Sequence, residues 1–258
     1  MDTIFLKKNN GIAWVTLNRP EAMNAFNYDM IRELGETIEQ IRIDPEVRVV
    51  VLTGSGERAL SVGADLKERK TLSDVDVKRN LNKIGEVFTM IDQLPQPTIA
   101  MINGFAFGGG MELALACDFR FAAMSAIMGL TETGLAIIPG AGGTQRLPRL
   151  VGEAKALELI LTAQRLSASD AALCGLVTRA VEDAVLQDET QQFAEKILAN
   201  GPIGVQQAKF AIKQGMKTDL ATGLSIERKA YEITIPTEDR IEALNAFAEK
   251  RKPMFKGR

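Results

Sequence analysis

The stretch GFAFGGGMELALACD, residues 104–118, is almost entirely apolar and carries a single carboxylate in its interior, Glu112. The three glycines before it let the backbone approach a ligand closely, because no side chain is in the way. A helix beginning near Gly109 would direct its first N–H groups, and the positive end of its dipole, into the space that the glycines leave open. This geometry suits an anion, or an oxygen that becomes negative during a reaction.

Glu112 alone has an ordinary interpretation, because a glutamate in the first turn of a helix is favoured by the dipole and can serve as a cap. A second lone acid changes this interpretation. Glu132 lies among the apolar residues of IMGLTETGLAIIPGAGG, residues 127–143, before another glycine cluster. The segment SVGADLKER at 61–69 adds a small-residue turn, which alone is typical of a plain turn. Together the segments could supply two N–H donors and two carboxylates, a set suited to acid–base chemistry beside a thioester carbonyl.

The composition narrows the chemistry further. The chain has 258 residues, of which 46% are hydrophobic and 25% charged, which predicts one compact domain or one domain with a smaller appendage. The net charge is −2 with both signs spread along the chain, so no polyanion partner is indicated. The chain contains no histidine, which excludes Ser-His-Asp hydrolysis, Cys-His chemistry and histidine-ligated metals. A general acid or base must therefore be a carboxylate, Lys, Tyr or Cys.

Features that report on cellular location predict a cytoplasmic protein. Cys117 and Cys174 are too few and too far apart for a disulfide framework or a zinc site. The start, MDTIFLKKNNG, lacks the long apolar core of a signal peptide. Residues 93–111 are uncharged, but prolines, polar residues and glycines interrupt them, so we expect a buried segment and not a membrane helix.

Hydrophobic patterning predicts an alternating α/β core followed by a helical appendage. Asn200-Gly201-Pro202 is the clearest boundary signal, because Gly and Pro together end one helix and allow another to begin. We therefore expect two regions, residues 1–199 and residues 200–258. The expected strands are 12–17, 47–53, 98–102, 118–123 and 176–181, and the expected helices are 27–43, 73–92, one from about 109, 185–199, 203–214, 219–233 and 237–250.

Taken together, these motifs resemble those of the crotonase (enoyl-CoA hydratase/isomerase) superfamily, and the resemblance extends over almost the whole chain. A single GGG motif would be weak evidence, but five motifs in the family's order are specific. They are NRPEAMNAF (18–26), GADLKER (63–69), NGFAFGGGMELALACD (103–118), ETGLAIIPGAGGTQRLPR (132–149) and the tail EKRKPMF (249–255). The resemblance implies an α/β spiral of ββα units with a C-terminal helical region that builds a trimer, commonly paired into a hexamer.

The resemblance also implies roles for individual residues. The backbone N–H groups of Ala64 and Gly109 would form the oxyanion hole for the thioester carbonyl, and removing one such donor typically costs about 2.7–4 kcal/mol. Glu112 and Glu132 would be the catalytic pair that holds a water. By the family assignment Glu112 activates the water for attack at the β-carbon, Glu132 delivers a proton to the α-carbon, and the Gly140 N–H helps to position the water. Apolar surroundings would raise the carboxyl pKa values toward neutrality.

Coenzyme A is part of the substrate in this family, and the resemblance implies no metal and no other cofactor. The exposed Lys67 would lie near the nucleotide phosphates, although an exposed lysine on such a turn is often only solvated. The residues implied in CoA binding are Ala22, Val62, Asp65, Leu66 and Lys67, with Phe247 and Lys250 contributed by a neighbouring subunit.

Within the superfamily the chain is most similar to the methylglutaconyl-CoA hydratase subgroup, on the motifs MGLTETGLAIIPGAGGTQRLPR and QGMKTDLATGLSIE. This would place it in leucine breakdown. Leu60 and Val62 depart from the Phe and Ala that are more frequent in the family, which bears on acyl preference. One subgroup member also binds RNA through a lysine-rich first helix, but residues 27–46 carry six acids against two arginines here, a face that would repel phosphates.

Three hypotheses follow. The first is an enoyl-CoA hydratase that adds water across the 2,3 double bond of a 2-trans-enoyl-CoA. The second is a double-bond isomerase acting on a 3-enoyl-CoA, which needs the oxyanion hole and one base. The third is a non-catalytic acyl-CoA-binding or RNA-binding protein, against which the two glutamates and the acidic helix argue respectively.

Overall fold

The two longest strands that are buried at every residue lie at the centre of a six-stranded sheet. In the computed structural model, which describes residues 2–258, every residue of β3 (Val49–Gly54) and β5 (Thr98–Ile102) is buried. Continuous runs of apolar and β-branched residues are typical of parallel strands covered on both faces. The strand order is β1-β2-β3-β5-β7-β10, and only the β1–β2 pair of this sheet is antiparallel.

A second, four-stranded sheet has the order β4-β6-β8-β9. From β3 to β8, consecutive strands alternate between the two sheets, and each pair is followed by a helical segment: β3 and β4 precede α2 and α3, β5 and β6 precede α4, and β7 and β8 precede η2 and α5. This repetition is the predicted α/β spiral of ββα units. The short strands of the second sheet carry the turns that line the site.

The elements have the following bounds. The other strands are β1 (Ile4–Asn9), β2 (Ile12–Leu17), β4 (Ala59–Ser61), β6 (Phe105–Phe107), β7 (Phe119–Ala123), β8 (Ile127–Gly129), β9 (Leu166–Ser167) and β10 (Arg179–Val181). The helices are α1 (Tyr28–Arg42), α2 (Leu66–Arg69), α3 (Asp74–Asp92), α4 (Gly109–Ala116), α5 (Gly143–Val151), α6 (Glu153–Leu161), α7 (Ala168–Leu173), α8 (Leu186–Leu198), α9 (Pro202–Gly215), α10 (Leu220–Thr234) and α11 (Glu238–Ala248), with 3-10 helices η1 (Pro20–Ala22), η2 (Glu132–Leu135) and η3 (Asp183–Val185).

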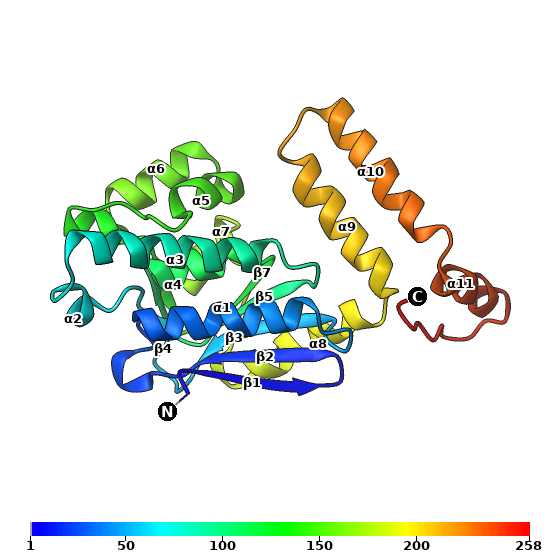
Figure 1. Ribbon diagram of the computed structural model, residues 1–258, viewed down its shortest axis with the longest axis horizontal. Coiled ribbons are helices and arrows are strands. Elements are labelled where there is room, and N and C mark those ends of the chain that lie inside the picture. The colour runs from blue at the N-terminus through cyan, green and yellow to red at the C-terminus, as the bar shows by residue number, and fades with distance from the viewer. Residues whose placement is uncertain (1) are drawn as a thin grey trace. The chain divides into compact units, whose positions relative to one another are not determined.

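Helices α1 and α3 contact each other and lie above strands β1 and β2 in the view of Figure 1. The side chain of Asn27 accepts a hydrogen bond from Met30 N and caps α1, and Ser73 caps α3 through Asp76 N. The buried face of α1 is apolar and recurs at helical spacing, as in Met30, Leu34 and Ile38. This packing fixes α3, which forms one wall of the site.

The chain divides into two compact units, residues up to 94 together with 98–191, and residues 95–97 together with 192–258. The division falls within α8. The predicted boundary at residues 199 and 200, and the trimerisation role of residues 200–258, stay predictions.

In the second unit, α9 and α10 form an antiparallel pair (Figure 1). A Cβ on Gly215 would lie 3.6 Å from the Cα of Gly223, so the two backbones approach closely. The C-terminal segment is attached to α11, because Asp239 accepts from Lys256 N and Gly257 N, and Glu242 pairs with Arg251.

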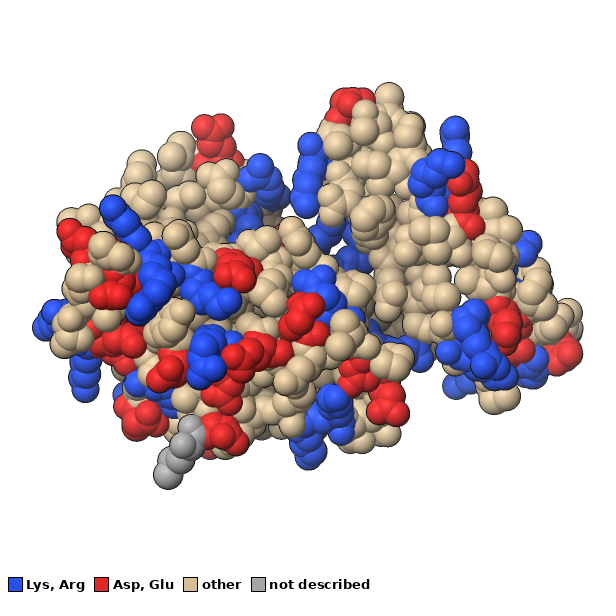
Figure 2. All heavy atoms as spheres, in the orientation of Figure 1, with Lys and Arg blue, Asp and Glu red and all other residues tan. Residues whose placement is uncertain are grey.

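The face of the molecule drawn in Figure 2 is mixed in charge. Figure 2 shows lysine and arginine side chains lying among aspartate and glutamate side chains on the face in view. No helix within residues 2–258 is long and apolar enough to cross a bilayer. Over the same described residues, His, Cys, Asp and Glu side chains form no group that could hold a metal ion.

Candidate active site

Two glycine-rich backbone segments touch where β4 and β6 end. A Cβ on Gly110 would lie 2.0 Å from Ser61 O, and a Cβ on Gly63 would lie 2.8 Å from Gly109 N. Gly63 also has a φ of +88°, which side chains rarely tolerate. Glycine at these positions therefore lets the turn at 61–65 lie directly against the start of α4.

The N–H groups of Ala64 and Gly109 both lie at this contact. Ala64 forms an isolated parallel bridge with Phe26, in which Phe26 N donates to Gly63 O at 2.8 Å and Asp65 N donates to Phe26 O at 2.9 Å. This pairing uses the groups on either side of Ala64 and leaves its own N–H outside the bridge. Gly109 is the first residue of α4, where N–H groups have no partner inside the helix. Both residues line one cavity of about 710 Å³.

The turn that carries Ala64 is held by polar side chains. Ser61 Oγ donates to Asn24 O at 2.7 Å and accepts from Gly63 N at 3.1 Å. Arg19 Nη2 lies 2.9 Å from Asp65 Oδ2. Burial alone would raise the pKa of Asp65, but the hydrogen bonds from Arg19 and from backbone N–H groups hold it below its ordinary value. The carboxylate therefore stays charged and anchors the turn.

Glu112 is buried, with 3% of its surface exposed, and its carboxylate reaches the glycine cluster after η2. Its Oε1 accepts from Ala141 N and Gly143 N, both at 2.8 Å. Gly143 is the first residue of α5, so Glu112 caps a helix other than its own. Burial raises the pKa of Glu112, and the two N–H groups and the positive charge of Arg146 oppose the rise.

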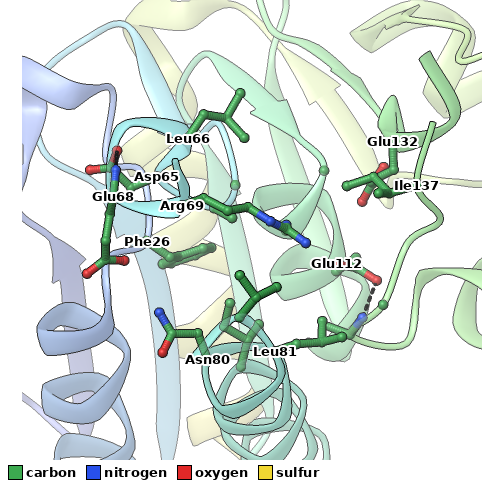
Figure 3. Close-up of a pocket in the computed structure, with 18 of the residues that line it drawn as sticks. Phe26, Asp65, Leu66, Glu68, Arg69, Asn80, Leu81, Glu112, Glu132 and Ile137 are labelled. Atoms are coloured by element: carbon green, nitrogen blue, oxygen red, sulfur yellow. Dashed lines mark hydrogen bonds between the residues drawn. The ribbon is translucent and has the colours of Figure 1, made fainter. Parts of the chain in front are cut away.

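Glu132 has different surroundings. It begins η2, is 8% exposed, and its Oε2 is buried with no hydrogen-bond partner among the described residues. Burial, followed by the charge of Glu112, raises its pKa to about 7. A Cβ on Gly108 would lie 3.4 Å from Glu132 Oε1, so the glycine run also leaves room for this carboxyl. Glu112 and Glu132 face the cavity from one side (Figure 3).

The remaining wall of the cavity is mostly apolar. Arg69 from α2 extends into the cavity toward the two glutamates (Figure 3) and is its one cationic lining residue among those that the structure describes. Apolar side chains come from α3, η2 and the segment after it, including Val77, Leu81, Ile84, Leu135, Ile137 and Ile138.

This geometry combines two N–H groups that have no partner within residues 2–258, two buried carboxyls of unlike environment and an apolar cavity. A model of the family described as enoyl-CoA hydratase/isomerase matches residues 7–258. The chain belongs to the enoyl-CoA hydratase/isomerase family. The predicted resemblance and crotonase fold are thereby confirmed.

Other family members agree over nearly the whole chain. A solved enoyl-CoA hydratase from Bacillus anthracis is 50% identical with a TM-score of 0.98, covering 99% of this chain and 100% of that chain. The short-chain-enoyl-CoA hydratase of Clostridium acetobutylicum is 42% identical, over 98% of this chain and 97% of its own. The human mitochondrial methylglutaconyl-CoA hydratase is 45% identical, over 97% of this chain and 75% of its own.

The cavity of this hydratase/isomerase family member brings together most of the predicted site. Its lining includes both glutamates and both predicted oxyanion donors, together with Gly140, Val62, Asp65 and Leu66. The N–H groups that bind Glu112 belong to Ala141 and Gly143, and the role of the Gly140 N–H toward a water stays a prediction.

Four predicted CoA-binding residues lie elsewhere. Ala22 ends η1 and Lys67 lies on α2, and neither is among the lining residues of the cavity. Phe247, at the end of α11, is 87% exposed, and Lys250 follows it; both lie in the second unit. Their roles in CoA binding stay predictions.

Sequence reasoning missed several residues of the site. Arg19, Ala141, Gly143 and Arg146 all lie within the quoted motifs, but no role was assigned to them. Arg69 ends the motif GADLKER and was also unassigned. Nothing local distinguishes Arg69 from its neighbours Lys67 and Lys70, so the sequence offers no signal for its place in the cavity.

Proposed function

We propose that the protein is an enoyl-CoA hydratase that adds water reversibly across the 2,3 double bond of a 2-trans-enoyl-CoA to give a 3-hydroxyacyl-CoA. The observation that carries the proposal is the unlike pair of glutamates beside the Ala64 and Gly109 N–H groups, which no other described residue pairs. Glu112 has N–H donors and a nearby cation for its negative charge, whereas burial and Glu112 favour the protonated form of Glu132. One base and one acid face the same cavity, as hydration requires.

In the proposed reaction the thioester oxygen accepts hydrogen bonds from the N–H groups of Ala64 and Gly109. Glu112 takes a proton from the water as the water oxygen bonds to the β-carbon, and the electron pair of the double bond moves toward the thioester, where the oxygen becomes negative. Glu132 gives its proton to the α-carbon. Preorganised donors aimed at the developing charge supply the main stabilisation of the transition state. The glutamates exchange protonation states in each cycle.

The direct test is the loss of the conjugated enoyl-thioester absorbance of crotonyl-CoA, with mass spectrometry to show one added water. The control is the Glu112→Gln, Glu132→Gln double variant, which keeps the size of both side chains. Absence of hydration for straight and branched enoyl-CoA substrates alike would reject the proposal. Conversion of a 3-enoyl-CoA to its 2-enoyl isomer without hydration would favour the isomerase alternative.

A finer proposal concerns the acyl group. We propose methylglutaconyl-CoA, and thus a role in leucine breakdown, as the natural substrate, supported by the similarity to the human methylglutaconyl-CoA hydratase. A specific observation favours an acyl chain with a distal carboxylate. The Arg69 guanidinium forms no ion pair within residues 2–258 and extends into a cavity whose other wall residues are largely apolar. A carboxylate on the substrate would supply its missing partner.

The proposal also covers the cofactors, assembly, location and binding partners of the enzyme. We propose that it works without a metal or a separate cofactor, as a cytoplasmic homotrimer or homohexamer, and binds neither nucleic acid nor membranes. The acids of α1 pair with its own arginines, as in Arg32–Glu36 at 3.0 Å and Arg42–Glu39 at 3.1 Å, which leaves little free positive charge on this helix. Activity after treatment with a chelator, light scattering, cell fractionation and filter binding to RNA test these points separately.

A further inference from the structure

Arg146 fills the inside of the glycine-rich loop that holds Glu112. Its Nη1 donates to Ala141 O at 2.9 Å. A Cβ on Gly142 would lie 2.1 Å from the same Nη1, and Gly142 has a φ of +110°. A residue with a side chain would be strained at this φ and would displace the guanidinium, so glycine at position 142 lets the loop fold around Arg146. The side chain of Arg146 is 19% exposed, which places its charge largely within the protein.

Ala141 is consequently held on both of its backbone polar groups. Its N–H donates to Glu112 Oε1 at 2.8 Å, and its carbonyl accepts from Arg146. Arg146 lies one turn into α5, and the first residue of α5, Gly143, provides the second N–H to Glu112. One arginine thus fixes the loop from which both donors to the carboxylate arise.

The charges around Glu112 give Arg146 an electrostatic role as well. Glu132 from η2 is the neighbouring acid whose negative charge, when present, repels that of Glu112. Arg69 from α2 extends into the same cavity. From α5, Arg146 favours the ionised form of Glu112. On another side of Arg146, the Asp92 carboxylate of α3 lies 4.0 Å from its Nη2 and is its ion-pair partner. Arg146 is therefore the cation that is connected to Glu112 through hydrogen bonds of the loop, by way of Ala141.

We propose that Arg146 is a positioning residue for the reaction: it holds the Ala141 and Gly143 N–H groups in place and keeps the Glu112 carboxylate ionised inside an apolar cavity. This inference rests on the proposed function only for its kinetic consequence. The ionisation of Glu112 can be measured without any turnover.

The test compares Arg146→Gln and Arg146→Lys with the wild type, and uses Arg149→Gln as the matched control. Arg149 lies on the same helix, but its side chain is exposed and, within the part of the chain that the structure describes, bonds only Gln145 O. We expect Arg146→Gln to lower kcat for crotonyl-CoA about tenfold, to leave KM within about twofold, and to move the acidic limb of the kcat/KM profile up by roughly one pH unit. Arg146→Lys keeps the charge, so its acidic limb stays near the wild-type position while kcat falls.

A second readout is an infrared titration of the carboxyl band, assigned to Glu112 by its loss in Glu112→Gln. We expect Arg146→Gln to shift this titration upward and Arg149→Gln to leave it unchanged. A folded Arg146→Gln variant with wild-type limb and band positions would overturn the inference, even if kcat falls uniformly with pH. If Arg146→Gln does not fold, the test falls to Arg146→Lys. An acidic limb of the kcat/KM profile that moves to higher pH in this variant, although the charge is kept, would overturn the electrostatic role. An inactive wild type with the expected band shift would instead refute only the proposed function.

Discussion

Glu112 and Glu132 line the same cavity, but only one of them has its charge supported by the protein. Glu112 Oε1 accepts two backbone N–H groups at 2.8 Å, while Glu132 Oε2 is buried without a partner in the described chain. Environments that push two carboxyl pKa values apart assign the base and the acid. The difference arises at the start of α5, where the Gly143 N–H donates to Glu112 and not to Glu132.

The pH dependence of kcat/KM for hydration should be bell-shaped. Hydration needs Glu112 ionised and Glu132 protonated, so activity falls at low pH as Glu112 gains a proton. It also falls as the pH rises through about 7, the raised pKa of Glu132. Initial rates with crotonyl-CoA in buffers of constant ionic strength measure both limbs, which belong to the coupled pair. A profile flat through neutrality would contradict the assignment of Glu132 as the acid.

Glu132→Gln should stabilise the folded protein at neutral and higher pH. The pKa of Glu132 rises from 4.5 to about 7 on folding, so the folded state favours the protonated carboxyl. Wild-type stability therefore decreases as the pH rises from about 4.5 to about 7 and the decrease levels off above it. The amide of the variant carries no charge, so its Tm advantage over the wild type should grow over this window to a few degrees. Calorimetry at several pH values measures this difference in Tm. A Tm difference that does not change with pH would argue against the raised pKa of Glu132.

Gly63→Ala should reduce kcat about 100-fold, because the new Cβ would lie 2.8 Å from Gly109 N and would displace one oxyanion donor. Gly85→Ala is the matched control: it lies on α3, and its Cβ would have no atom within 4 Å. We expect Gly85→Ala to keep full activity and to gain about 0.5–1 kcal/mol of stability. Crotonyl-CoA kinetics and thermal unfolding of both variants provide the comparison. Equal activity of Gly63→Ala and Gly85→Ala would show that the contact between Gly63 and Gly109 is not needed for catalysis.

Arg69→Gln should change substrate selectivity more than catalysis. We expect kcat/KM for methylglutaconyl-CoA to fall about 10-fold to 100-fold, because a charge-assisted hydrogen bond to the distal carboxylate is lost. The value for crotonyl-CoA, which lacks that carboxylate, should change less than about threefold. Arg69→Lys retains the charge and should recover part of the selectivity. Equal losses on both substrates would assign Arg69 to the shared CoA portion or to the fold.

The long elements of the fold could be predicted from the sequence because their patterns are local. The predicted strands 12–17 and 98–102 coincide with β2 and β5, and the predicted helix 27–43 is α1 within one residue at each end. The second sheet was missed because β4, β6 and β8 have only three residues each, which is too short for a periodicity. α5 was missed as well, and it contains Pro148 in its interior.

The site could be predicted only in part, for a related reason. Glu112 and Glu132 stand out as lone acids among apolar residues, and the glycine runs mark a close backbone approach. The partners of Glu112 lie 29 and 31 residues further along the chain, and nothing local indicates that pairing. The same holds for Arg19 and Asp65, which are 46 residues apart. Such contacts depend on how the spiral stacks its turns, so the structure was needed to find them.

The central claim is that both glutamates carry out the chemistry, and the single variants test it most directly. The measurement is the rate of absorbance loss of crotonyl-CoA, or of methylglutaconyl-CoA if the straight chain is a poor substrate, with wild type, Glu112→Gln and Glu132→Gln. We predict that each variant folds, binds acyl-CoA and loses activity by about 100-fold to 10,000-fold. Full activity in either variant would contradict the two-glutamate mechanism.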